Sequence, residues 1–200
     1  MRREEHYLDS PEIKAALARQ GDFWVFGYGS LMWDPGFRHA EVHPALLYGY
    51  HRRFCVYSYR YRGTPECPGL VLGLDHGGAC RGMAYRVTRR HAKEALLYLW
   101  ERELRGGGYH MKTVRLRLPG RRVISAYTFV VDHGHKDYAG ELSLRQTAKY
   151  IVQGSGDRGP CSHYLENTVE HLEELGLVDG HLHRLAEIVR RMAAAQRQSP

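Results

Sequence analysis

The chain has 200 residues, of which 43% are hydrophobic and 26% charged, as expected of a globular protein with a substantial core. Its formal net charge of +7 favours anionic partners, but the basic residues are dispersed in pairs, which argues against a nucleic-acid-binding surface. No apolar run approaches the ~18 residues of a membrane-spanning helix, so the composition argues against a transporter.

The beginning of the chain and the cysteines bear on the cellular compartment. Residues 1–7 contain acidic side chains and no apolar stretch, so they predict neither a secretory signal nor a transit peptide. The cysteines are scattered without a Cys-x-x-Cys pair, and we expect reduced thiols at Cys55, Cys67, Cys80 and Cys161. Both features favour a cytoplasmic protein.

The first predicted element is a short helix over residues 8–20, because Ser10 is a suitable N-cap and Pro11 fits the first helical position. An aromatic and β-branched run over residues 22–26 predicts a strand that ends at Gly27. A loop is predicted over residues 59–69 and a turn over residues 76–79. Between these features, extended segments are predicted over residues 40–47, 53–59, 70–75 and 80–87.

Apolar residues at three- and four-residue steps predict a helix over residues 89–104, which ends at the glycine run 106–108. Strands over 112–118 and 123–131 are predicted to meet at a turn of Pro119 and Gly120. The last third of the chain is predicted to be helical, over residues 143–152, 163–175 and 181–196. Strands followed by helices predict an α+β fold, a small mixed β-barrel or curved sheet flanked by helices.

The loop from Phe26 to Leu31, with the sequence Phe-Gly-Tyr-Gly-Ser-Leu, is the first candidate site. Glycines let a backbone approach a ligand closely, and successive N–H groups can bind an anion. The loop lacks the third glycine of a dinucleotide fingerprint and the Lys-Ser/Thr of a P-loop. On chemistry alone, a structural turn and a ligand-binding loop are equally supported.

Glu103 is the second candidate, as an acid/base residue. The ordinary interpretation is a solvated glutamate in the last turn of a helix. Two observations favour a functional one: the carboxylate lies at the unfavourable end of the helix dipole, and it precedes three glycines that leave it little shielded. Glu101 is the nearest rival, but residues two apart on a helix do not face the same way.

Together these segments resemble the ChaC-like γ-glutamylcyclotransferase family. Residues 24–31 resemble its substrate loop, which ends Tyr-Gly-Ser-Leu, and Arg102-Glu103 followed by residues 107–109 resembles its catalytic Arg-Glu and Gly-Gly-Tyr ending. Further similar segments are residues 52–54, 61–65 with 68–69, 81–85 and 159–165. The similarity runs from about residue 23 to residue 190.

The resemblance implies a γ-glutamylcyclotransferase-like fold in a single domain over residues 23–192, with an N-terminal helical extension (1–22) outside it. The tail (193–200) is predicted to be flexible, as chain ends often are. It implies that Glu103 is the acid/base residue. It also implies that the substrate is bound by Tyr28, Gly29, Ser30 and Leu31, with Arg62 and Tyr164 in or near the pocket. From the residues alone, Tyr164 could equally be a packed aromatic side chain and Arg62 a surface charge on a loop.

The implied activity is that of a lyase that cleaves glutathione to 5-oxoproline and Cys-Gly by intramolecular aminolysis, with no cofactor or metal. Two alternatives stay open: a cyclotransferase for other γ-glutamyl amino acids or amines, and a non-catalytic regulator linked to cation transport. We expect the histidines at 133, 135, 181 and 183 to lie on the surface, because nothing nearby completes four metal ligands. Glutathione is the predicted partner, without nucleic acid or membrane, and the oligomeric state is unknown.

Overall fold

A computed structural model describes residues 10–198 of the chain. These residues form two compact units, one of residues 10–51 and 74–132 and the other of residues 52–73 and 133–198. We describe each unit by itself. The division into an N-terminal extension (1–22), a single domain (23–192) and a tail (193–200) stays a prediction.

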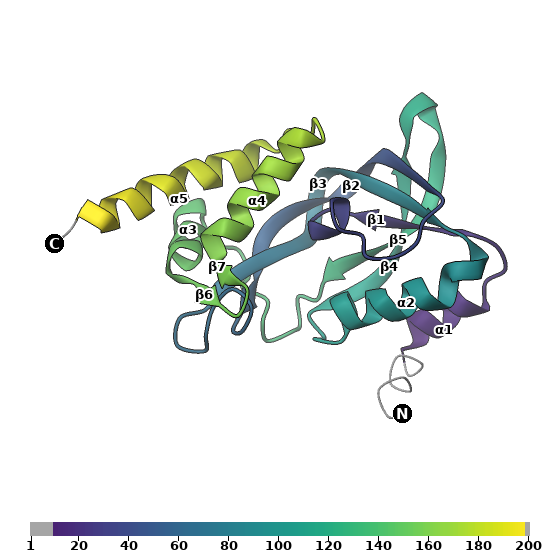
Figure 1. The fold of residues 1–200 in the computed structure, drawn as a ribbon, viewed down its shortest axis with the longest axis horizontal. Helices are drawn as coiled ribbons and strands as arrows, with labels where there is room; N and C mark the ends of the chain where they lie inside the picture. Colours follow the sequence, from purple (N-terminus) through teal and green to yellow (C-terminus); the bar gives the residue numbers. More distant parts are fainter. Residues whose placement is uncertain (1–9, 199–200) are drawn as a thin grey trace. The chain divides into compact units, whose positions relative to one another are not determined.

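Five strands form a closed barrel in the order β1-β3-β2-β4-β5 (Figure 1). Strand β1 pairs antiparallel with β3 and parallel with β5, and β4 pairs antiparallel with β2 and β5. The long strands β2 and β3 each pass from one unit into the other. The bounds are β1 Phe23–Gly27, β2 Glu41–Ser58, β3 Gly69–Val87, β4 Tyr109–Arg117 and β5 Val123–Val131. The barrel with its helices confirms the predicted α+β class.

Strand β3 is continuous where the sequence predicts a turn over residues 76–79, so that prediction is wrong. Gly77 and Gly78 have φ values of +101° and +66°, which glycine adopts without steric cost. The carbonyl of Gly77 lies 3.1 Å from His51 Nδ1 on β2. The two glycines therefore adjust the path of the strand without reversing it, and the two segments predicted on either side form one strand.

Helices α1 (Pro11–Ala18) and α2 (Ala92–Leu99) lie side by side in the first unit (Figure 1). The predicted cap of α1 is confirmed, because the Ser10 hydroxyl accepts a hydrogen bond from the backbone N–H of Ile13. Ile13 is fully buried in a core cluster with Leu96 and Leu99 of α2 and with Phe129 of β5. Burial of these apolar side chains packs the two helices against the strands and stabilises that arrangement.

After α2 the chain forms a π-helical segment, η4 (Trp100–Leu104), marked by a hydrogen bond of 2.9 Å from the N–H of Arg105 to the carbonyl of Trp100. The glycine run 106–108 follows, and β4 begins immediately after it. The predicted hairpin of β4 and β5 is confirmed, with Gly120 in the turn at φ +70°. Arg105 and three glycines thus join the carboxylate segment to the barrel.

The second unit contains three helices that pack on one another, α3 (Leu144–Gln153), α4 (Cys161–Glu174) and α5 (Gly180–Gln198) (Figure 1). They confirm the predicted helical last third. Helix α3 begins with a capping box in which Ser143 and Gln146 satisfy each other's backbone N–H groups. Between α3 and α4, the chain forms a short hairpin of two two-residue strands, β6 (Ser155–Gly156) and β7 (Gly159–Pro160).

All four cysteines are free, as the sequence predicts. Cys55, Cys80 and Cys161 are buried, whereas Cys67 is exposed. The Cys161 thiol donates to the carbonyl of Leu70 at 3.0 Å, and burial raises its pKa to about 11. Cys161 is therefore a packed structural side chain.

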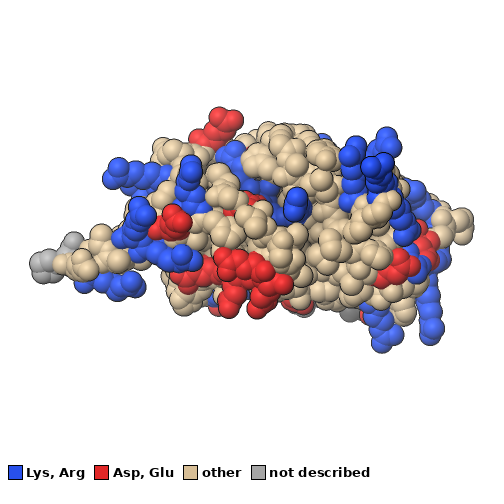
Figure 2. Space-filling model, turned by 90° about the horizontal axis from the view of Figure 1, so that it is seen from above, with Lys and Arg blue, Asp and Glu red and all other residues tan. Residues whose placement is uncertain are grey.

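On the face drawn in Figure 2, Lys and Arg side chains lie in several separate groups, in keeping with the dispersed basic pairs of the sequence. Within residues 10–198, no helix is both long and apolar enough to cross a membrane. The same residues contain no group of three or more His, Cys, Asp or Glu side chains that could hold a metal ion.

Candidate active site

Residues 28–31, which we call the glycine loop, follow β1 directly in the first unit. Tyr28 and Leu31 are 6% and 4% exposed, and their side chains pack into two different core clusters. Residues Ser30–Met32 form a short 3-10 turn, η2, in which the N–H of Met32 donates to the carbonyl of Gly29 at 2.8 Å. The buried side chains anchor the loop, so what it can offer a ligand is its backbone and the half-buried Ser30.

Close packing fixes the path of the loop. A Cβ at Gly27 would lie 2.9 Å from the Cβ of Leu31, and a Cβ at Gly82 on β3 would lie 2.3 Å from the carbonyl oxygen of Gly27. At the far end, the Tyr85 hydroxyl donates to the carbonyl of Met32 at 2.6 Å. Burial raises the pKa of Tyr85 to about 12, which keeps this donor protonated at physiological pH.

Glu103 lies in η4 with its side chain 17% exposed, whereas Glu101 is exposed to solvent. Burial raises the pKa of Glu103 from its ordinary value of 4.5 to about 7, and the positive charge of Arg102 opposes part of this shift. Such a carboxyl group changes protonation near neutral pH, which is what a general acid/base requires. π-helical segments are also frequent at functional sites.

Arg102 connects Glu103 to the glycine loop. Its guanidinium donates to Ser30 Oγ at 2.7 Å and to the carbonyl of Asp34 at 2.8 Å. It also donates to the Tyr98 hydroxyl at 2.5 Å, and its Nε lies 3.4 Å from Glu103 Oε1. The structure therefore brings Ser30 and Glu103 onto one arginine, although 73 positions separate them in the sequence.

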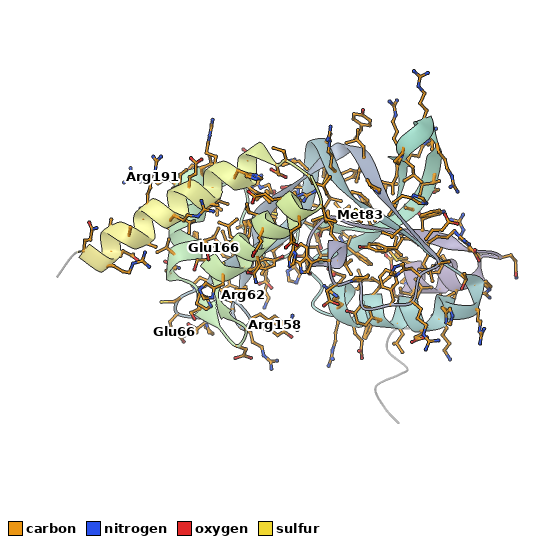
Figure 3. All side chains as sticks on the ribbon, turned by 45° about the horizontal axis from the view of Figure 1, so that its top comes forward. Arg62, Glu66, Met83, Arg158, Glu166 and Arg191 are labelled. Carbon is orange, nitrogen blue, oxygen red and sulfur yellow. The ribbon has the colours of Figure 1, made fainter. Side chains whose placement is uncertain are left out.

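Arg62 and Tyr164 belong to the second unit, where they lie together. The Arg62 guanidinium lies 5.1 Å from the centre of the Tyr164 ring, and it donates to the carbonyls of Arg158 at 2.5 Å and Pro160 at 3.2 Å. Figure 3 shows Arg62 and Arg158 close to the β6–β7 hairpin. Tyr164 also packs edge-on against Phe54, with ring centres 5.5 Å apart. Their participation in substrate binding stays a proposal.

Four glycines hold the segment that carries Arg62. A Cβ at Gly69 would lie 2.0 Å from the carbonyl oxygen of Arg62, and a Cβ at Gly63 would lie 2.1 Å from the N of Gly69. A Cβ at Gly154 would lie 2.5 Å from the carbonyl oxygen of Arg62, and one at Gly156 would lie 2.2 Å from that of Arg60. Hydrogen bonds from the N–H of Asp157 and Arg158 to the carbonyls of Arg60 and Tyr61 complete the contact. We call these residues, Gly63, Gly69, Gly154 and Gly156, the glycine cluster.

The partners of Arg102 are not among the contacts predicted from the sequence. The spacing of four residues between Tyr98 and Arg102 is a signal for that pair, because such residues are neighbours on a helix. The contact with Ser30 leaves no comparable signal, because it depends on how the loop and the helix meet. The hydrogen bond of Tyr85 to the loop was missed for the same reason.

Comparison with known proteins agrees with these features. A family model described as ChaC-like protein matches residues 23–192. The chain is 35% identical over 199 residues to the glutathione-specific γ-glutamylcyclotransferase of Escherichia coli, covering 96% of this chain and 86% of that protein. It is 37% identical over 178 residues to γ-glutamylcyclotransferase 2-3 of Arabidopsis thaliana, covering 84% of this chain and 88% of that protein.

A solved structure shares the fold. The crystal structure of the yeast γ-glutamyl cyclotransferase specific to glutathione superimposes with a TM-score of 0.79 at 24% identity, over 86% of this chain and 97% of that chain. The match of the family model covers most of the chain, and it includes both the glycine loop and Glu103. The chain belongs to the ChaC-like protein family.

Proposed function

We propose that this protein is a glutathione-specific γ-glutamylcyclotransferase, a lyase that converts glutathione to 5-oxoproline and Cys-Gly. The observation that carries the proposal is Glu103, a largely buried carboxyl group with a pKa of about 7 that is linked through Arg102 to the glycine loop. The names of the similar E. coli and yeast proteins support glutathione as the substrate.

The proposed reaction is an intramolecular aminolysis. The α-amine of the γ-glutamyl group attacks its own γ-carbonyl carbon, a C–N bond closes the five-membered lactam, and the amide bond to cysteine breaks. Because nucleophile and electrophile belong to one molecule, the enzyme has only to fold the substrate and move protons. Proximity of this kind lowers the barrier by about 7–11 kcal/mol in favourable cases.

Glu103 is proposed to move the proton. At neutral pH the substrate amine is largely protonated and cannot attack. The ionised carboxylate takes that proton and returns it to the cysteine nitrogen as the amide bond breaks, so the carboxylate is regenerated in each turnover. A pKa near the working pH suits both steps, because the group must gain and lose a proton with similar ease.

The loop is proposed to bind the γ-glutamyl group through the backbone N–H groups of Tyr28, Gly29, Ser30 and Leu31. Donors fixed in position before the reaction can stabilise the negative charge that develops on the γ-carbonyl oxygen. The buried side chains of Tyr28 and Leu31 support this role, because they hold the backbone in one conformation.

Two further proposals concern substrate binding by residues of the second unit and the location of the protein in the cell. Arg62 and Tyr164 are proposed to bind substrate, with Arg62 suited to a carboxylate. We also propose a cytoplasmic location, where glutathione keeps thiols reduced, which suits four free cysteines.

The test is to incubate the purified protein with glutathione and to follow 5-oxoproline and Cys-Gly by mass spectrometry. Formation of both products in equal amounts establishes the reaction. Turnover of γ-glutamyl amino acids or amines but not of glutathione would change the substrate class. Binding of γ-glutamyl compounds without turnover would favour the non-catalytic regulator.

The activity should depend on pH through Glu103. Because the base must be ionised in the free enzyme, kcat/KM should rise with pH and level off above the pKa of Glu103, which is about 7. The measurement is kcat/KM for glutathione from pH 5 to pH 9 in buffers of constant ionic strength. An acidic limb centred near the ordinary glutamate pKa of 4.5 would show that the working carboxylate is not the buried one.

A further inference from the structure

The guanidinium of Arg102 contacts four other residues through hydrogen bonds and ion pairs. The side chain is 20% exposed, and its partners come from three segments. Ser30 and Asp34 belong to the glycine loop and the residues after it, Tyr98 belongs to α2, and Glu103 follows Arg102 in η4. The guanidinium also lies against the Tyr98 ring, 5.7 Å from its centre.

The π-helical turn of η4 carries both Arg102 and Glu103. In a regular α-helix, adjacent side chains point about 100° apart, because a turn holds 3.6 residues. In η4 the turn is wider, and the side chains of Arg102 and Glu103 meet with Nε and Oε1 3.4 Å apart. One end of the guanidinium thus faces the carboxylate while Nη2 donates to Ser30 Oγ.

Arg102 is also the charged neighbour that acts on Glu103. Asp34 lies 3.9 Å from Nη1 of the guanidinium, and Tyr98 is the titratable side chain of α2 that accepts a hydrogen bond from it. Strand β4 packs against η4 and carries Tyr109 and His110, and His110 is paired with Asp132 at 3.2 Å. Burial raises the pKa of Glu103, whereas the positive charge of Arg102 lowers it.

We propose that Arg102 is a positioning residue, which holds Ser30 of the glycine loop by a hydrogen bond and the carboxylate of Glu103 by an ion pair, and so fixes the distance between substrate loop and base. The inference rests on the proposed cyclotransferase activity. Arginine suits the role because its planar fork presents five donors in fixed directions, whereas a lysine ammonium can satisfy fewer of these partners at once.

The test uses Arg102→Met, Arg102→Lys and the exposed neighbour Arg105→Met as a matched control. We expect Arg102→Met to lower kcat/KM for glutathione about 100-fold, mainly through kcat, because a displacement of 1 Å at a reacting group can cost that much. Arg102→Lys should recover part of the loss, to about 10-fold below wild type, and Arg105→Met should stay within about twofold. Wild-type kinetics in folded Arg102→Met would overturn the proposal.

The pH profile separates positioning from a loss of folded protein. Without the positive charge, the pKa of Glu103 rises, so the acidic limb of kcat/KM in Arg102→Met should move to higher pH. Arg102→Lys retains the charge and should keep the limb near that of wild type. A lower activity with an unmoved limb in Arg102→Met would mean that the arginine only stabilises the fold, and it would overturn the proposal.

The link through Ser30 is tested by a double-mutant cycle. Ser30→Ala should lower kcat/KM about 10-fold in the wild-type background and should have little further effect in Arg102→Met, because the contact it removes is already absent. Additive losses would overturn the link, because Ser30 would then act independently of Arg102.

A readout without substrate keeps this inference separate from the proposed function. The pKa of Glu103 can be followed by the NMR shift of its labelled carboxyl carbon in wild type and in Arg102→Met. If wild type does not turn over any γ-glutamyl compound, the proposed function fails. A higher pKa in Arg102→Met would still support the coupling of Arg102 to Glu103, and an unchanged pKa would overturn it.

Discussion

Replacing Glu103 by Gln should lower kcat for glutathione by about 10²–10⁴-fold, the range that a well-placed general acid/base contributes. Glutamine keeps the volume of the side chain and can still accept a hydrogen bond from Arg102, but it cannot take a proton from the substrate amine. The measurement is the rate of 5-oxoproline formation by wild type and Glu103→Gln at pH 8. The value of KM should change much less, because the substituted group acts in the chemical step.

Glu101→Gln is the matched control for this result. It removes a carboxylate from the same segment, two residues away, where the side chain is exposed. Its kcat should stay within about twofold of wild type. A loss of similar size in both variants would mean that η4 tolerates neither substitution, and equal rates in wild type and Glu103→Gln would refute the role of Glu103.

The same variant should be more stable than wild type at pH 8, which shows that its inactivity does not come from unfolding. The pKa of Glu103 is raised from 4.5 to about 7 in the folded state, so the unfolded chain loses the proton first as the pH rises. The free energy of unfolding of the wild type therefore falls as the pH rises from 4.5 to about 7, by up to about 3 kcal/mol. Glutamine avoids this cost, so the advantage of Glu103→Gln in urea unfolding should shrink toward pH 4.5.

Gly69→Ala should destabilise the second unit by about 3 kcal/mol or more, above the usual range for overpacking. The added Cβ would lie 2.0 Å from the carbonyl oxygen of Arg62 and 3.2 Å from the Cβ of Cys161. The nearest atom is backbone, so it cannot rotate away as a flexible side chain could. In thermal unfolding the midpoint should fall by about 6–12 °C.

Gly180→Ala is the control for Gly69→Ala within the same unit. A Cβ at Gly180 would meet nothing within 4 Å, so alanine should be neutral or slightly stabilising there. Equal midpoints for Gly69→Ala and wild type would mean that the loop of residues 59–69 can move away from the β6–β7 hairpin without cost, and that the glycine cluster does not hold it.

The elements that sequence predicts well are those with a local cause. The cap at Ser10 and the three- and four-residue apolar spacing around Leu96 depend on residues within a few positions of one another, and the structure has both features. The turn expected at Gly77 and Gly78 failed because the same glycines also fit a continuous strand, and pairing with β2 decides between the two. Local preference cannot make that choice.

The candidate site divides in the same way. Glu103 stands out in the sequence because a carboxylate before three glycines is unusual, and the family resemblance points to the same residue. The pKa of Glu103, however, depends on burial by residues distant in the sequence and on the position of Arg102. The glycine cluster cannot be predicted from the sequence either. Gly69 and Gly154 have the local sequence of ordinary loop glycines, and only the structure shows that their backbones are in contact.

The distribution of the cysteines has a consequence for a protein that meets thiols and disulfides in solution. Exchange with a disulfide requires an accessible thiolate, and burial raises the pKa of Cys161 to about 11, so that side chain is both enclosed and protonated. Cys55 and Cys80 are enclosed as well, whereas Cys67 is exposed in the loop of residues 59–69. Oxidised glutathione should therefore form a mixed disulfide with the folded chain at Cys67, leaving the unit that carries Glu103 unmodified.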